Sequence, residues 1–130
     1  MNDTGYHYII DMKVRSGLSV LNEPLILQSI FKEALAGFTI LKSDFFKFSG
    51  GGEGVTGFFL LSESHCSYHT YPENSYIAID VFTCGRNPSG IAEALATALN
   101  AVSYNSRYVM RGSKQAEFLI KQFQTEELMA

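Results

Sequence analysis

The sequence predicts an α+β two-layer sandwich, a mainly antiparallel β-sheet with helices on one face. Five segments show the alternation or the short apolar runs of strands, and two show the apolar spacing of amphipathic helices. Their order along the chain is strand, helix, three strands, helix, strand (β-α-β-β-β-α-β). The inner strands are apolar on both faces, so both faces of the sheet need a cover.

The first strand and the first helix lie in the amino-terminal third. Residues 6–14 alternate as a strand, and His7 within it is read as an ordinary strand histidine. One face of this strand carries Tyr8, Ile10 and Met12. The sequence Asn22-Glu23-Pro24 predicts a helix start, because Pro is tolerated in the first turn and Glu suits the helix dipole. The apolar stripe of this helix is predicted as Ile26, Ile30, Phe31 and Leu35, with Gly37 as its C-cap.

A glycine-rich turn joins the next two strands, residues 39–48 and 55–62. The segment Gly52-Glu53-Gly54-Val55-Thr56-Gly57 matches the dinucleotide-binding pattern G-x-G-x-x-G. In that motif the last glycine opens a helix whose N-terminus meets pyrophosphate, whereas a strand follows here. The glycines therefore indicate a hairpin connection.

The remaining predicted elements are a strand at residues 76–84, a helix at 87–99 and a strand at 102–110. The helix is rich in alanine and has an apolar stripe of Ile91, Leu95 and Leu99. A polar tail with some helix tendency follows at residues 114–129.

The third and fourth predicted strands indicate a homodimer. Phe58 and Leu60 lie on one face of the third strand, and Phe59 and Leu61 lie on the other. If a set such as Phe59, Leu61 and Phe82 were open to water, it would form a patch that monomeric proteins seldom carry. Two helices cover only one face of the sheet. We therefore expect one set under the helices and the other against a second copy, in helix–sheet–sheet–helix (αββα) layers.

The composition excludes several classes of function. A chain of 130 residues is expected to form a single domain, residues 1–130. Its net charge of −3 and scattered Lys and Arg argue against nucleic-acid binding. No apolar run is long enough to cross a membrane, and Met1-Asn2-Asp3-Thr4 does not begin a signal peptide. Two cysteines make no disulfide framework, so a cytoplasmic location is expected.

A polar stretch at residues 60–73 crowds hydroxyls, imidazoles, carboxylates and a thiol between two apolar strands, and we interpret it as a functional connection. A Ser–His–Asp hydrolase site would have Ser64 in a G-x-S-x-G turn, which is missing. A zinc site built from His65, His69, Cys66 and Cys84 is disfavoured, because Cys66 points away from both histidines in an extended chain. Cys66 is expected to be a small packing residue.

The motif that decides the interpretation is Glu63-Ser64-His65, with His69 five residues and Cys84 twenty residues after Ser64. The surrounding sequences are His69-Thr70-Tyr71-Pro72-Glu73 and Asp80-Val81-Phe82-Thr83-Cys84-Gly85. Together they closely resemble the prokaryotic, pyruvoyl-dependent S-adenosylmethionine decarboxylase proenzymes. The resemblance extends more weakly over most of the chain, and it implies the same fold and the same dimer.

The resemblance implies self-cleavage between Glu63 and Ser64. The products would be a β chain, residues 1–63, and an α chain, residues 64–130, whose first residue becomes a pyruvoyl group. The Ser64 hydroxyl would attack the carbonyl of Glu63, and loss of the Ser64 α-proton would then release the new chain end. His69 is the expected base, since imidazole titrates near neutral pH. The family has Ser where this chain has Thr56, which keeps the supporting hydroxyl and adds a methyl group, so slower processing is expected.

The resemblance also implies how substrate is handled. The pyruvoyl ketone would form a Schiff base with the amine of S-adenosylmethionine, without pyridoxal phosphate or metal. Cys84 would return a proton to the α-carbon, and the role of Asp80 is open. Tyr71 stands where the family has Trp, and it could stack on adenine or face the sulfonium. Glu73 could bind ribose hydroxyls or a cationic group.

The expected activity is decarboxylation of S-adenosylmethionine for spermidine synthesis. Because Tyr71 departs from the family pattern, a pyruvoyl-dependent arginine or ornithine decarboxylase is an open alternative. A non-catalytic regulatory homologue is a further one, against which the intact Glu63-Ser64, His69 and Cys84 count.

Overall fold

The computed structural model describes residues 2–16, 19–50, 53–62 and 64–117. They form one six-stranded sheet in the order β2-β3-β4-β5-β1-β6, in which all neighbouring strands are antiparallel. The strands are β1 (Gly5–Val14), β2 (Ile40–Phe48), β3 (Gly54–Leu61), β4 (Ser64–Tyr71), β5 (Tyr76–Cys84) and β6 (Ala101–Arg111). The helices are α1 (Pro24–Ala34) and α2 (Ile91–Ala98), with short 3₁₀ turns η1 (Ser19–Asn22) and η2 (Pro72–Asn74).

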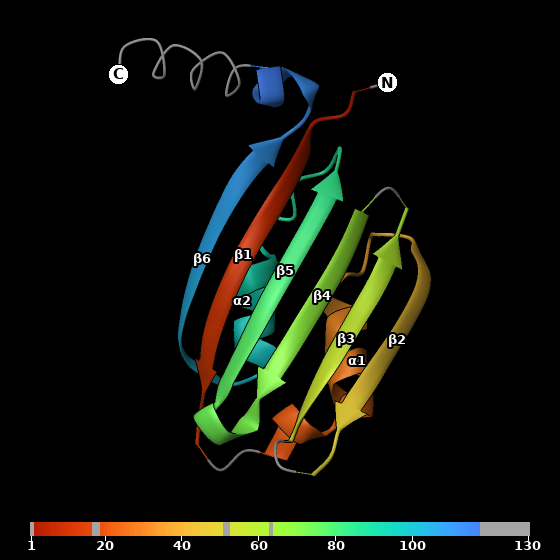
Figure 1. Cartoon of the computed structure of the whole chain (residues 1–130). Helices are drawn as coiled ribbons and strands as arrows, with labels where there is room; N and C mark the ends of the chain where they lie inside the picture. The colour runs from red at the N-terminus through yellow and green to blue at the C-terminus, as the bar shows by residue number, and fades with distance from the viewer. Residues whose placement is uncertain (1, 17–18, 51–52, 63, 118–130) are drawn as a thin grey trace, which may run out of the picture.

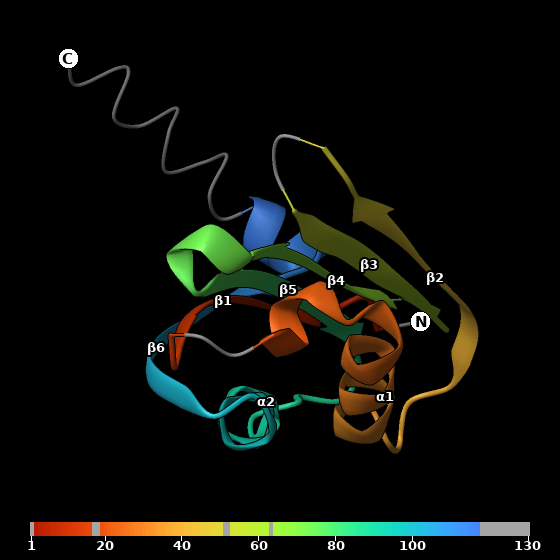
Figure 2. The same cartoon turned by 90° about the horizontal axis from the view of Figure 1, so that it is seen from below.

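Both α-helices lie on the same side of the sheet, as Figure 2 shows in edge view, and in Figure 1 the strands lie in front of them. The predicted α+β two-layer sandwich is therefore confirmed. No helix of the described part of the chain is long and apolar enough to cross a membrane.

The predicted element order is wrong by one strand. Residues 64–71, interpreted from sequence as a connection, form β4, one of the two central strands. Its helix-side residues Ser64, Cys66, Tyr68 and Thr70 are buried, but only two of them look apolar in the sequence. The hydroxyl of Thr70 is satisfied in the core, because Thr70 Oγ1 donates to the Leu21 carbonyl at 2.7 Å and accepts from Val55 N at 2.7 Å. The strand was not recognised from the sequence because some of its buried side chains are polar and find hydrogen-bond partners inside the core.

The core lies between the sheet and the helices and centres on stacked aromatic rings. The ring of Phe31 from α1 lies 4.4 Å from that of Tyr68 and 6.2 Å from that of Phe59, measured between centroids. The Tyr68 hydroxyl donates to Gln28 Oε1 in α1. Gly57 in β3 leaves the space that this tyrosine needs, since a Cβ there would lie 2.3 Å from the Tyr68 ring.

The helix patterns are partly confirmed. In α2, the predicted stripe of Ile91, Leu95 and Leu99 is buried. In α1, Phe31 and Leu35 are buried as expected, but Ile26 is half exposed and Leu27 takes its place in the core. Gly37 is not the C-cap: the helix ends at Ala34, and Gly37 turns the chain two residues after the C-cap with a φ of 98°. Of the predicted carboxyl-terminal helix tendency, residues 113–117 form one turn and the remainder lies outside the described residues.

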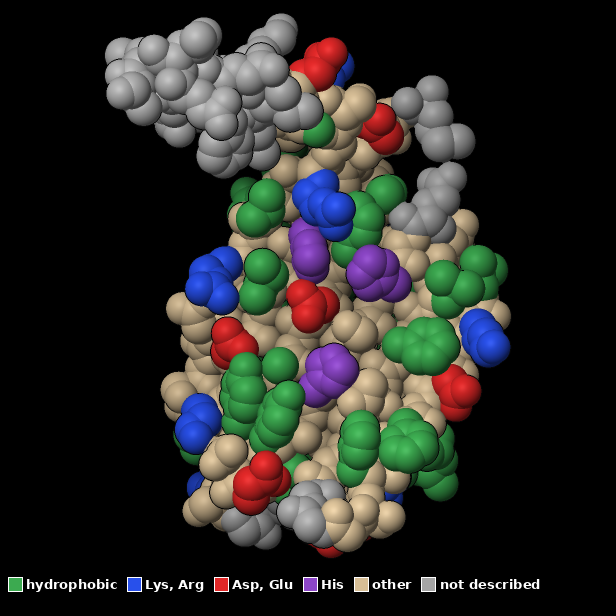
Figure 3. Space-filling view, in the orientation of Figure 1, with side chains coloured by type: hydrophobic (Ala, Val, Ile, Leu, Met, Phe, Trp, Pro, Cys, Tyr) green, Lys and Arg blue, Asp and Glu red, His purple; other side chains and the backbone are tan. Residues whose placement is uncertain are grey.

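The two faces of β3 differ in burial, as the alternation of its side chains predicts. Phe59 and Leu61 are fully buried under the helices, whereas Phe58 and Leu60 are 40% and 45% exposed on the other face. Phe82 lies on the same side as Phe58 and Leu60, so the set of Phe59, Leu61 and Phe82 does not form one patch. We call the side away from the helices the open face. All three histidines of the chain lie on it, in the middle of the view in Figure 3.

Candidate active site

Two of the predicted site residues, Thr56 and His69, are paired across the open face. They are direct partners in the register of β3 and β4. Thr56 Oγ1 and His69 Nδ1 share a hydrogen bond of 2.9 Å. The bond fixes the imidazole against the sheet and brings the predicted base and its supporting hydroxyl together.

This pair lines a pocket of about 330 Å³ at one end of β3 and β4. The pocket is lined by Phe48, Glu53, Gly54, Thr56, His69, Thr70, Tyr71 and Glu73. Tyr71 is 43% exposed, and its ring stacks on that of Tyr76 with centroids 5.5 Å apart. The predicted substrate residues Tyr71 and Glu73 thus lie beside the Thr56–His69 pair. Phe48 and Glu53 were not expected there, because only the hairpin register brings them next to β4.

The start of β4 with Ser64 and the end of β5 with Cys84 are neighbours at the other end of the sheet, but Ser64 points to the helix side and Cys84 to the open face. Ser64 is the first residue of β4, directly before His65, whose partner in β5 is Phe82. Cys84 lies two residues beyond Phe82 and is partly exposed. Ser64 is 8% exposed, and its Oγ donates to the carbonyl of Ser62 at 3.3 Å within the turn. The other predicted cleavage residue, Glu63, lies outside the described residues.

The two groups are separated within one chain. Ser64 and His69 are five residues apart on β4, which corresponds to about 16 Å along a strand. Their side chains also leave opposite faces of the strand, since Ser64 is buried and His69 is exposed. A general base must come within hydrogen-bonding distance of the proton that it removes. His69 therefore does not reach Ser64 of its own chain in this arrangement.

Aromatic and charged side chains surround Phe82 at the Ser64 end. The ring of Phe82 lies 5.6 Å from that of His65 and 5.8 Å from that of His7, and Arg111 Cζ lies 4.6 Å above it. Gly5 lies under the ring, where a Cβ would come within 2.6 Å of it. The sequence did not indicate this cluster, because it depends on β1 lying beside β5.

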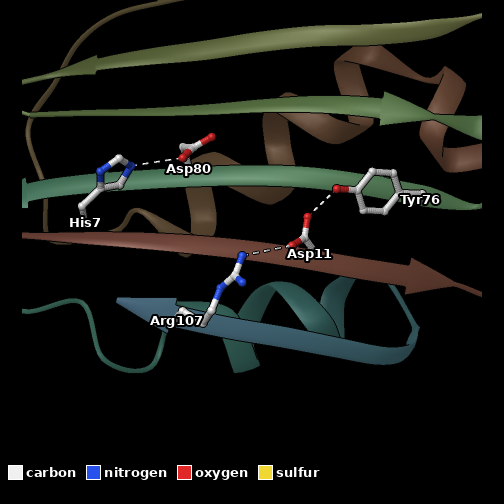
Figure 4. Close-up of polar contacts among 5 residues, drawn as sticks. All are labelled: His7, Asp11, Tyr76, Asp80 and Arg107. Atoms are coloured by element: carbon white, nitrogen blue, oxygen red, sulfur yellow. Dashed lines mark hydrogen bonds and ion pairs between the residues drawn. The ribbon is translucent and has the colours of Figure 1, made fainter. Parts of the chain in front are cut away.

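Polar contacts continue from there along the open face. His7 Nε2 lies 3.1 Å from Asp80 Oδ1, and Asp11 accepts a hydrogen bond from the Tyr76 hydroxyl while lying 3.7 Å from Arg107 (Figure 4). The bond to the Asp11 carboxylate raises the pKa of Tyr76 to about 12, and partial burial adds to the shift. His7 is therefore more than an isolated strand histidine, since it orders Asp80 at the middle of this face.

Cys66 takes the packing position that the sequence predicted. It is fully buried under the helices, and burial raises the pKa of its thiol. Because His65 and His69 lie on the open face, Cys66 cannot bind the same ion as these two residues. Among the described residues, no three His, Cys, Asp or Glu side chains are grouped so that they could hold a metal ion.

Comparison with known proteins identifies the family. The model of the S-adenosylmethionine decarboxylase family matches residues 6–112, which include both groups of site residues. The chain belongs to the S-adenosylmethionine decarboxylase family. It is 38% identical over 119 residues to the S-adenosylmethionine decarboxylase proenzyme of Symbiobacterium thermophilum, with 88% of each chain covered. It is 35% identical over 132 residues to the proenzyme of Bacillus cytotoxicus, with 98% of each covered.

The fold of this S-adenosylmethionine decarboxylase family member also has a solved counterpart. The crystal structure of the adenosylmethionine decarboxylase from Aquifex aeolicus superimposes with a TM-score of 0.75 at 25% sequence identity. The match covers 86% of this chain and 93% of the other.

Proposed function

We propose that the chain is made as a proenzyme, cleaves itself between Glu63 and Ser64, and then decarboxylates S-adenosylmethionine with a pyruvoyl group made from Ser64. Membership of the S-adenosylmethionine decarboxylase family supports this activity. The decarboxylated product would supply aminopropyl groups for spermidine synthesis. The observation that carries the proposal is the hydrogen-bonded pair of Thr56 and His69 on the same sheet whose other end carries Ser64 and Cys84 on neighbouring strands.

The position of the scissile bond suits a chain that is cut after folding. Ser64 follows the tight connection between β3 and β4, so a cut there interrupts no strand. Attack of Ser64 Oγ on the Glu63 carbonyl forms an ester and breaks the peptide C–N bond. Removal of the Ser64 α-proton expels the Glu63 carboxylate and leaves a dehydroalanine, which water converts to the pyruvoyl ketone and ammonia. Both strands stay hydrogen-bonded to their neighbours throughout.

A second copy of the chain brings its His69 to the open side of the bond, where the imidazole approaches the backbone of Ser64, because the Ser64 hydroxyl leaves the helix side. The open face carries exposed apolar side chains such as Phe58 and Leu60 together with the histidines. When two copies pack open face to open face about a two-fold axis near Ser67, midway between the two groups, the Thr56–His69 pair of one copy lies over the Ser64 end of the other. Packed sheets lie about 10 Å apart, a gap that side chains fill. Each of two equal sites then uses residues of both copies.

This arrangement also joins the substrate pocket to the reacting group. The pyruvoyl carbonyl would supply an electron sink for the electron pair that stays on the α-carbon when carbon dioxide leaves. Cys84, on the open face at the end of β5 next to the start of β4, returns a proton to the α-carbon. Tyr71 and Glu73 from the second copy hold the nucleoside, through ring stacking and ribose hydroxyls. A reactive free thiol at Cys84 suits a reducing compartment such as the cytoplasm.

Co-expression of two inactive variants tests the shared site. A Ser64→Ala chain keeps His69, and a tagged His69→Ala chain keeps Ser64. Expressed alone, each is expected to remain uncut. Expressed together, the His69→Ala chain is expected to be cleaved in the mixed dimers, because its partner supplies the imidazole. The α chain should begin with a pyruvoyl group by mass spectrometry, and light scattering should give the mass of two precursors.

Two results would contradict the shared site. If the mixed dimers form and stay uncut, the base does not come from the partner. If the His69→Ala chain cleaves fully on its own, His69 is not the base. Carbon dioxide release from S-adenosylmethionine, arginine and ornithine, measured side by side on the cleaved enzyme, tests the substrate. Release from arginine or ornithine alone would overturn the proposed activity.

A further inference from the structure

The pocket beside His69 is acidic as well as aromatic. Two carboxylates, Glu53 and Glu73, line it together with the rings of Phe48 and Tyr71. The described residues of its lining include no Lys or Arg. Carboxylates and aromatic faces both attract cations, so the pocket as a whole favours a positively charged ligand over a neutral one of the same shape.

Glu53 is held in place by contacts outside the pocket. Asn22 at the end of η1 donates from Nδ2 to Glu53 Oε2 at 3.1 Å, and no side chain of the described residues donates a hydrogen bond to Oε1. The next residue, Gly54, passes so close to β4 that a Cβ there would lie 2.5 Å from the Thr70 carbonyl oxygen. The backbone after Glu53 is therefore pinned against the strand that carries His69 and Tyr71. This carboxylate is more ordered than a free surface glutamate.

We propose that Glu53 determines specificity for a sulfonium ligand over the neutral thioether that carries the same nucleoside. The inference rests on the proposed function and assigns the two carboxylates different tasks. Glu73 directly follows Tyr71 and Pro72, so it lies at the nucleoside end and binds ribose hydroxyls, which both ligands share. Glu53 interacts with the positive charge, which only the sulfonium has. Discrimination arises from charge, because S-adenosylmethionine and S-adenosylhomocysteine differ only by one methyl group and that charge.

Binding measurements on a chain that cannot react test this assignment. In the Ser64→Ala background, calorimetry gives the Kd of S-adenosylmethionine and of S-adenosylhomocysteine for the dimer. Glu53→Gln is expected to weaken the sulfonium about fivefold, as for a partly exposed ion pair, and to change the thioether less than about twofold. In the Ser64→Ala chain that keeps Glu53, the preference for S-adenosylmethionine over S-adenosylhomocysteine should also shrink as the salt concentration is raised, since salt screens such a contact.

Three further variants separate the possible results. Glu73→Gln is expected to weaken both ligands alike. Asn22→Ala, which releases Glu53, is expected to lose part of the preference. Glu93→Gln on the helix side changes the net charge equally and should change neither Kd. If Glu53→Gln weakens both ligands equally or neither, the inference is wrong while the proposed function stands. If neither ligand binds to the Glu53 chain, both proposals fail together.

Discussion

Among single residues, Thr56 gives the most direct prediction, because its hydroxyl should affect the rate of self-cleavage. It hydrogen-bonds to His69 and so sets the position of the imidazole. Thr56→Val keeps the branched shape and removes the hydroxyl, and it is expected to slow self-cleavage about tenfold or more. Thr56→Ser keeps the hydroxyl without the methyl group and should cleave at least as fast as the unchanged chain. A time course of the two products on a denaturing gel measures both rates. Equal rates for Thr56→Val and Thr56→Ser would remove the hydroxyl from the mechanism.

Cys84 allows cleavage and turnover to be separated. It lies beside Ser64 at the strand ends, but its expected task follows the formation of the pyruvoyl group. Cys84→Ala should therefore be cleaved normally and then decarboxylate S-adenosylmethionine at least about a hundredfold more slowly, as expected for loss of a proton donor. The fraction cleaved and carbon dioxide release, measured on the same sample, give the two effects. Unchanged turnover and unchanged lifetime would show that the thiol is not the donor.

The spacing of Ser64, His69 and Cys84 named the candidate residues, but it could not give their arrangement. In a strand, the spacing of five residues puts Ser64 and His69 far apart and on opposite faces. This arrangement can be inferred only once β4 is known to be a strand. The cluster of His7, Asp80 and Phe82 was hidden for a similar reason. Its members meet through the pairing of β1 with β5, between residues more than seventy positions apart.

At the scale of elements, apolar periodicity predicted the helices and five of the six strands, and it failed at β4. This strand faces the helices with two hydroxyls, a thiol and a tyrosine, and it faces the open side with histidines and serine. Both faces therefore carry polar residues, and the sequence lacks the alternation of apolar and polar residues that identifies a half-buried strand. The polar residues on the open side are explained by their proposed function. Those on the buried side are tolerated because Thr70 and Tyr68 form hydrogen bonds there.

The packing of β3 against β4 gives an element-scale prediction. A Cβ at Gly57 would overlap the Tyr68 ring, which cannot easily move because it stacks on Phe31 and bonds to Gln28. Gly57→Ala is therefore expected to lower the free energy of unfolding by about 1–3 kcal/mol. Gly90→Ala is the matched control, because nothing lies within 4 Å of its added Cβ. Denaturant titration of the two variants in the uncleaved Ser64→Ala background compares them, and equal stabilities would contradict the packing argument.

At the scale of the whole molecule, the strand order interleaves the two products of the proposed cleavage. The β chain would hold β1, β2 and β3, and the α chain would hold β4, β5 and β6. In the sheet, β4 pairs with β3, and β1 lies between β5 and β6. The two chains therefore share three ladders of backbone hydrogen bonds, those of β3 with β4, β5 with β1 and β1 with β6. Neither chain retains a complete sheet without the other.

This interleaving predicts that the cleaved chains remain together until the protein unfolds. Native mass spectrometry of the cleaved enzyme should show both chains in every particle, and free α or β chain should appear only with denaturant. After dilution from denaturant, recovery of fold in the Ser64→Ala precursor monomer needs no second chain, since all six strands are covalently joined. Recovery of the cleaved protein should instead depend on concentration, because β1 must find β5 and β6 on another molecule. Release of either chain under native conditions would contradict the strand order or the position of the cut.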